Sequence, residues 1–138
     1  MVHDRFMPEA DLLLTVDIEP EFHQIMMSVA GVDPDEPDAL LEWIDGAGAN
    51  SDNSQILVAT WSDDNDPVAV SVWRDRPQLD GWTHVHTAQL IVGSKGLLVG
   101  MTVSAVWHGI AAHQGPTVVE VWVRPEYQPR EVNFVLMP

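Results

Sequence analysis

The longest uncharged stretch of the chain alternates regularly between residues 96 and 107. Apolar side chains occupy every second position there: Leu97, Val99, Met101, Val103, Ala105 and Trp107. A period of two is typical of a strand, in which successive side chains point to opposite faces of a sheet. No Asp, Glu, Lys or Arg occurs from Gly96 to Val119. We therefore expect this strand at the centre of a sheet, with both of its faces shielded from water.

The same stretch is too short for a transmembrane helix, which needs about 20 mostly apolar residues. It is interrupted by His108, His113 and Pro116. Its many β-branched side chains also favour a strand over a helix. A buried helix in a soluble protein remains as the alternative.

The first fifty residues combine one strand pattern with two helix patterns. Residues 11–18 (DLLLTVDI) predict a first strand. A first helix is predicted over residues 20–31 by apolar side chains at the i, i+3, i+4 and i+7 positions: Phe22, Ile25, Met26 and Val29. A second short helix is predicted over residues 37–46 by its buried side: Leu40, Leu41 and Ile44.

Beyond residue 54 the pattern changes to strands that are joined by short connections. Two hairpins are predicted, one pairing residues 55–61 with 67–74 and the other pairing residues 82–92 with 97–107. Two further strands, over residues 117–124 and 131–137, follow with regular alternation. Their valines and Phe134 define one apolar face.

The order strand, helix, helix and six strands predicts a single α+β domain over residues 1–138. Residues 1–54 would form an acidic strand–helix–helix part. Residues 55–138 would form a six-stranded antiparallel meander with the helices packed on one face. The order resembles that of the helix-grip fold of small-ligand-binding proteins, although the predicted elements lack the long C-terminal helix of that fold. The resemblance covers the order of elements alone and implies no activity.

Composition indicates a globular protein, because 46% of the 138 residues are hydrophobic. The chain has no cysteine, which excludes disulfides and thiolate metal sites. The N-terminal stretch carries acidic residues where a signal peptide needs basic residues and a long apolar segment. We therefore expect a cytoplasmic location.

Negative charge is concentrated in the first half of the chain. Residues 1–66 contain sixteen Asp and Glu and one basic residue, whereas residues 67–138 contain five of each kind. The net charge of −15 therefore lies wholly in the first half. Such a surface attracts a basic partner and speeds its association. Adaptation to high salt and a merely solvated acidic face are the two alternatives.

The acidic residues expected to contact such a partner lie in the second predicted helix and its approach. They are Asp33, Asp35, Glu36, Asp38, Glu42 and Asp45. The five arginines and one lysine are scattered among acidic residues and form no basic stripe. Direct binding to nucleic acid or to a membrane is therefore not expected.

Three histidines are candidates for a metal site. His84 and His86 are two residues apart in a predicted strand, so they would leave the same face, and the predicted hairpin would bring His108 near them. The pattern departs from the His-x-His and following Glu of the cupins, since Gln89 stands where an acid is expected. We therefore expect no bound metal and no cofactor.

Two classes of function remain. The first is a non-enzymatic acidic protein that docks a basic macromolecular partner, as an inhibitor, an immunity-type protein or a nucleic-acid mimic, or as a subunit of a larger assembly such as a viral particle. Formation of a homo-oligomer is left open. The second is a small-ligand-binding protein or metal-dependent enzyme with a helix-grip-like pocket near His84, His86 and His108. The lack of cysteine and of a Gly-x-Ser-x-Gly motif favours the first, non-enzymatic class.

Overall fold

The computed structural model of the chain describes residues 10–19, 24–37, 48–60, 67–101 and 106–137. These residues form ten strands and no helix. The strands are β1 (Asp11–Ile18), β2 (Gln24–Val29), β3 (Ala49–Ser51), β4 (Gln55–Ala59), β5 (Val68–Arg74), β6 (Thr83–Val92), β7 (Leu97–Met101), β8 (Val106–Ile110), β9 (Gly115–Arg124) and β10 (Glu131–Met137). Within these ranges no helix is long and apolar enough to cross a membrane.

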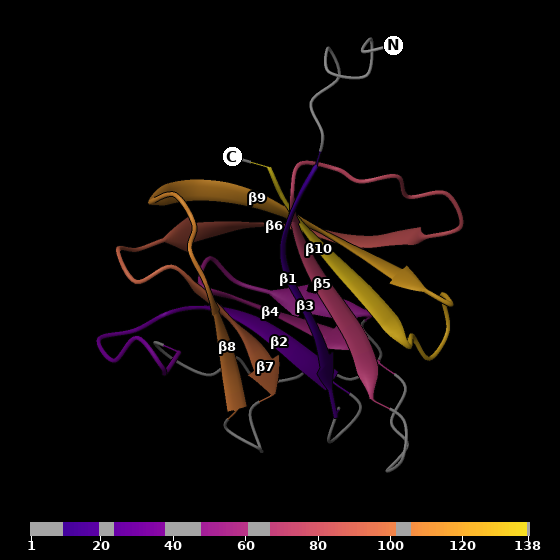
Figure 1. Ribbon diagram of the computed structural model, residues 1–138, viewed down its shortest axis with the longest axis horizontal. Coiled ribbons are helices and arrows are strands. Elements are labelled where there is room, and N and C mark those ends of the chain that lie inside the picture. Colours follow the sequence, from indigo (N-terminus) through magenta and orange to yellow (C-terminus); the bar gives the residue numbers. More distant parts are fainter. Residues whose placement is uncertain (1–9, 20–23, 38–47, 61–66, 102–105, 138) are drawn as a thin grey trace, which may run out of the picture.

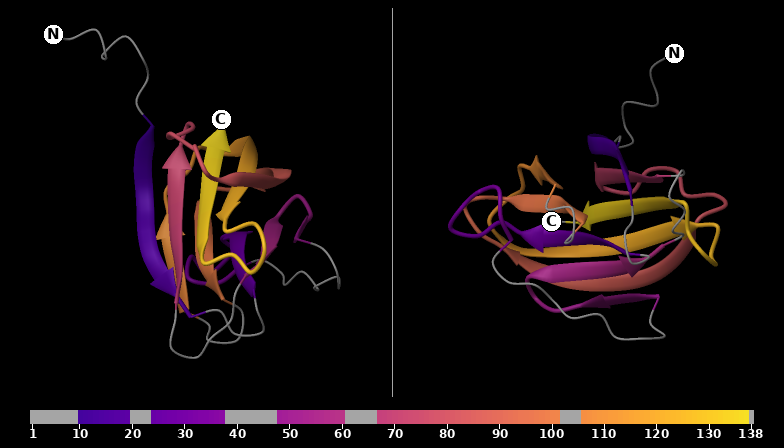
Figure 2. Two further views of the ribbon diagram at one scale, coloured as in Figure 1. Left: turned by 90° about the vertical axis from the view of Figure 1, so that its right-hand side faces the viewer. Right: turned by 90° about the horizontal axis from the view of Figure 1, so that it is seen from below.

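The strands form two five-stranded sheets that lie face to face (Figures 1 and 2). Sheet A has the order β1-β5-β10-β9-β6, and sheet B has the order β3-β4-β2-β7-β8. All the strand pairs are antiparallel except β5 and β10, which run parallel. The described part of the chain is therefore an all-β sandwich.

The core fills the space between the two sheets. Alternating residues of sheet A point into it, among them Val72, Val121 and Phe134, which are fully buried. Sheet B contributes Ile25, Val99 and other apolar side chains to the same cluster. The strands predicted over residues 11–18 and 131–137 are confirmed as β1 and β10, and the strand predicted over residues 117–124 is confirmed within β9.

Strand β7 is buried on both of its faces, as the uncharged stretch predicted. Val99 faces the core and Leu98 faces the outer side of sheet B, yet their exposed fractions are only 0% and 2%. The strand lies between β2 and β8. The prediction is therefore confirmed for residues 97–101. Residues 102–105 lie outside the described part, and residues 106–110 form the separate strand β8.

The α+β prediction is wrong, because the residues of the first predicted helix that the structure describes form strand β2. Ile25, Met26 and Val29 satisfy the helical spacing, but β2 is buried on both faces and so is apolar at nearly every position. A short apolar run of this kind fits a buried strand as well as a helix. The second predicted helix falls on residues 38–47, which lie outside the described residues.

Both predicted hairpins are also wrong. Strand β4 belongs to sheet B and β5 to sheet A, while β6 belongs to sheet A and β7 to sheet B. The short connections therefore cross from one sheet to the other. At Gly96 the backbone has a φ of 79°, and a Cβ atom there would lie 2.4 Å from the carbonyl oxygen of Ile110. The meander and the helix-grip order are replaced by a sandwich.

Burial of β7 on two faces can be tested with one acidic substitution on each face. Val99→Asp and Leu98→Asp should each lower the free energy of unfolding by about 3 to 5 kcal/mol, because each buries an uncompensated charge. Gln89→Glu, on the exposed face of β6, serves as the control. It should change the free energy of unfolding by no more than about 0.5 kcal/mol. Urea-induced unfolding measures all three. If Leu98→Asp is as mild as the control, the outer face of sheet B is open to solvent.

Candidate functional site

Three of the predicted partner-binding residues lie in the connection between β2 and β3. Asp33, Asp35 and Glu36 are all exposed there. The other three, at positions 38, 42 and 45, lie outside the described residues.

Residues 30–37, at the start of this connection, form a closed turn rather than an open loop. The Gly31 N–H donates to the Glu36 carbonyl oxygen at 2.7 Å, and Ala30 forms an antiparallel bridge with Pro37. The Asp35 N–H donates to Asp33 Oδ1 at 3.0 Å. These bonds hold the backbone together while the acidic side chains project outward. We call residues 33–36 the acidic turn.

Among the described residues, no Lys or Arg forms an ion pair within 4.0 Å with the acidic turn. The three ion pairs among the described residues lie elsewhere, on sheet A: Arg74–Asp11, Arg76–Glu120 and Arg124–Glu131. Pro34 and Asp35 also border a hollow of about 420 Å³, whose other walls include Lys95 and Ile110. The acidic turn thus combines unpaired charge with a concave neighbouring surface.

The outer face of sheet A is covered in part by the β5–β6 connection, residues 75–82. Arg76 reaches from this connection to Glu120 on β9 and donates two hydrogen bonds, at 2.7 and 2.5 Å. The Trp122 indole N–H donates to the same carboxylate at 3.2 Å. The bonds from Arg76, helped by Trp122, hold the pKa of Glu120 below its usual range although burial opposes them.

Two more tryptophans lie on this face of sheet A. The Trp73 indole N–H donates to Asn133 Oδ1 at 3.2 Å, and the guanidinium of Arg124 stacks 4.3 Å from the centre of the Trp82 ring. Arg124 also pairs with Glu131. The face is therefore a network of bonded aromatic and charged side chains, which positions the β5–β6 connection on the sheet.

The prediction that His84 and His86 share one face is wrong, because the β6–β9 register shifts between them. His84 lies opposite Trp122 on the outer face, 4.9 Å from that ring, and bonds the Thr87 hydroxyl at 2.7 Å. His86 lies opposite Val121 on the inner face, and its Nε2 is 2.7 Å from the hydroxyl oxygen of Ser51 in sheet B. A β-bulge at Val85 causes the difference.

His108 does not join the other two histidines. It lies on β8, opposite Val99, on the inner side of sheet B, whereas His84 is on the outer side of sheet A. Among the residues that the structure describes, no three His, Asp or Glu side chains gather as metal ligands would. The hairpin that would have brought His108 close to His84 does not form.

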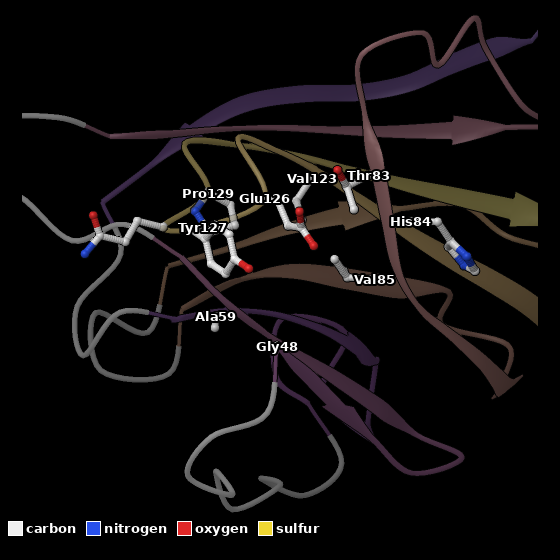
Figure 3. A pocket seen from close by; sticks show the side chains of 10 residues that line it. Gly48, Ala59, Thr83, His84, Val85, Val123, Glu126, Tyr127 and Pro129 are labelled. Atoms are coloured by element: carbon white, nitrogen blue, oxygen red, sulfur yellow. The ribbon is translucent and has the colours of Figure 1, made fainter.

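A pocket of about 570 Å³ opens at the end of the sandwich where β6 begins (Figure 3). Its lining comes from β3–β4, β6, β9 and the β9–β10 connection: Gly48, Ala59, Thr83, His84, Val85, Val123, Glu126, Tyr127, Gln128 and Pro129. Of the three predicted histidines only His84 borders it, and its side chain is turned away from Glu126 and Tyr127 (Figure 3). Sequence reasoning missed this pocket. Its one available signal was Tyr127, the single tyrosine of the chain, set between two prolines.

The pocket and the acidic turn lie at opposite ends of the molecule (Figures 1 and 2). Strand β6 runs between them, and its ten residues span about 33 Å at 3.3 Å per residue. They are therefore two separate surfaces, and a partner would have to be large to contact both.

No protein-family profile matches the sequence, and no curated protein is similar to it in a sequence search. Two solved structures share its fold. One is the crystal structure of ComJ, inhibitor of the DNA degrading activity of NucA, from Bacillus subtilis. It has a TM-score of 0.67 and 11% identity, and the match covers 94% of this chain and 98% of that one. The other, described as crocagin biosynthetic gene J, has a TM-score of 0.51 and 9% identity, with coverage of 95% and 99%. At these identities the likeness shows the fold alone.

The partial burial of His86 predicts a pH-dependent stability. Burial lowers the pKa of His86, and the nearby His84 lowers it further. At this position the unfolded chain therefore binds a proton more readily than the folded chain does. The contribution of His86 to the free energy of unfolding is full above the unfolded pKa of about 6.5. It is lost as the pH falls through the lower pKa of the folded state. His86→Gln should reduce this loss, measured as the thermal midpoint between pH 7 and pH 5. His113→Gln, at an exposed position, is the control and should keep it. Equal losses in both variants would contradict the assignment.

Proposed function

We propose that this protein is a non-enzymatic, inhibitor-type binding protein that docks a basic protein partner through the acidic surface of its first half. The observation that carries the proposal is the acidic turn. Its carboxylates are exposed and have no ion pair with any described residue. The shared fold of ComJ, which inhibits the DNA degrading activity of NucA, supports an inhibitor role.

A nuclease is a suitable kind of partner for such a surface. An enzyme that binds the phosphate backbone does so with Lys and Arg side chains, and this attraction depends on charge rather than on base sequence. A folded protein with a net charge of −15 competes for the same basic surface. Its carboxylates would then occupy positions that phosphates take in the substrate.

The competing class, a small-ligand or metal-dependent enzyme near the three histidines, has less support. His84 lies on the outer face of sheet A, whereas His86 and His108 lie on the inner faces of sheets A and B. They form no common centre, so the described histidines do not provide the geometry that such an enzyme would need.

Affinity capture from the source organism at low and high ionic strength tests the proposal. We expect a basic protein to elute as salt rises, because charges more than about 8 Å apart are screened at physiological ionic strength. The purified partner is then assayed for nuclease activity with and without this protein. Recovery of an acidic partner, or binding that does not change with salt, would contradict the proposal.

Neutralising two residues of the acidic turn should slow association with the recovered partner. Asp35→Asn combined with Glu36→Gln leaves Asp33, which accepts the hydrogen bond within the turn. We expect the association rate to fall about two- to fivefold at low salt, with little change in dissociation, because exposed charges act mainly on encounter. Stopped-flow mixing or surface plasmon resonance measures both rates.

The matched control is Asp75→Asn combined with Asp80→Asn. Both residues are exposed on the β5–β6 connection, and the change in net charge is the same. If the two variants slow association equally, net charge alone is responsible and the acidic turn is not the docking site.

A further inference from the structure

The pocket at the end of the sandwich has an apolar interior and an acidic, aromatic rim. Val85, Val123 and Ala59 provide apolar walls, and the β9–β10 connection adds Glu126 and Tyr127. Figure 3 shows these last two side chains extending toward the space beside Val85 and Ala59. No lysine or arginine is among the described residues that line it.

Tyr127 is 82% exposed, which is unusual for an aromatic side chain on a well-packed protein. Exposed aromatic residues at the rim of a pocket are typical of binding hot spots. A tyrosine ring presents a negative face to a cation, and a carboxylate from the adjacent residue adds a full negative charge. The rim therefore favours a planar cation.

Two arginines adjoin the pocket lining in the sequence: Arg124 follows Val123, and Arg130 follows Pro129. The guanidinium of Arg124 stacks on Trp82 and pairs with Glu131 on the outer face of sheet A. The end of β1 adds the exposed carboxylates of Asp17 and Glu19 at the same end of the sandwich, since Asp17 pairs with Ala69 and Ala69 pairs with Glu131. Among the described residues at this end, the four acids Glu126, Glu131, Asp17 and Glu19 outnumber the two arginines, so the formal charge is negative.

We infer that this pocket receives an arginine side chain of the protein partner, an inference that rests on the function proposed above. An arginine guanidinium is planar, stacks on an aromatic ring and pairs with a carboxylate through two N–H groups. Its aliphatic stem would lie against Val85 and Val123. The volume of about 570 Å³ leaves room for the backbone on either side of that arginine.

The site can be tested without the partner by using a small probe. Acetyl-Gly-Arg-Gly-amide is titrated into the full chain labelled with ¹⁵N, and the same peptide with citrulline in place of arginine is the control. Citrulline has nearly the same shape but no charge. We expect a dissociation constant on the order of millimolar for the arginine peptide. Its shift changes should be confined to the amides of residues 83–85, 123 and 126–129.

Two variants link the binding to the rim. Glu126→Gln should weaken binding about fivefold, and Tyr127→Leu, which keeps an apolar side chain, should weaken it by a similar factor. Asp75→Asn is the control: Asp75 is exposed, and its N–H donates to the Leu136 carbonyl oxygen at the end of β10 that is far from the pocket, so binding should stay unchanged. Unchanged shifts elsewhere in each spectrum establish that the variants are folded.

Equal shifts with the citrulline peptide, or shifts that avoid the pocket, would overturn the inference. That failure is separate from failure of the proposed function. If the acidic-turn variant slows association with the partner but the arginine peptide does not bind, only the arginine site is wrong. If the peptide binds the pocket but no salt-sensitive partner is found, the proposed function is wrong.

Discussion

The structure depends on the burial of two apolar sheet faces against each other. The inward-facing valines of β5, β9 and β10, together with Phe134, form one apolar face of sheet A. This face would be exposed to water on an isolated sheet. Face-to-face packing at about 10 Å removes this surface from water. The arrangement leaves the two ends of the sandwich open, and loops gather there. Both the acidic turn and the pocket with Tyr127 lie at these ends, as the packing requires.

Where one face of a strand is buried and the other is polar, the sequence was sufficient to predict the strand. This holds for β1, and for β9 apart from its first two residues. In β2, which is buried on both faces, alternation is absent and the apolar run fits a helix equally well. Strand β7 is also buried on both faces, but the β-branched residues and the period of two over residues 96–107 marked it as a strand. The outer face of sheet B is buried too, and a single sequence does not show what surrounds a strand.

The pairing of strands was harder to predict than their positions. A connection of four residues such as 93–96 suits a hairpin, but here it crosses between the sheets.

The candidate site could likewise be predicted only in part. The positions of Asp33, Asp35 and Glu36 on an exposed turn follow from their polarity and flanking prolines. The pocket combines residues from four distant segments, so no local spacing could reveal it. The local sequence also does not reveal the β-bulge at Val85. This bulge places His84 and His86 on opposite faces of β6.

The bulge at Val85 has a further consequence for how the molecule behaves in a crowded solution. Strand β6 forms an edge of sheet A. Near the end of this edge the Ile91 N–H donates to the Asn53 carbonyl oxygen of the β3–β4 turn at 2.8 Å. A strand from another copy could extend the sheet only by matching a continuous ladder of hydrogen bonds. The extra residue breaks that ladder near its start and twists the strand locally. Open sheet edges promote aggregation, and an irregular edge resists it. The same backbone feature that sends two histidines to opposite faces thus helps to keep an all-β protein from adding copies of itself along this edge.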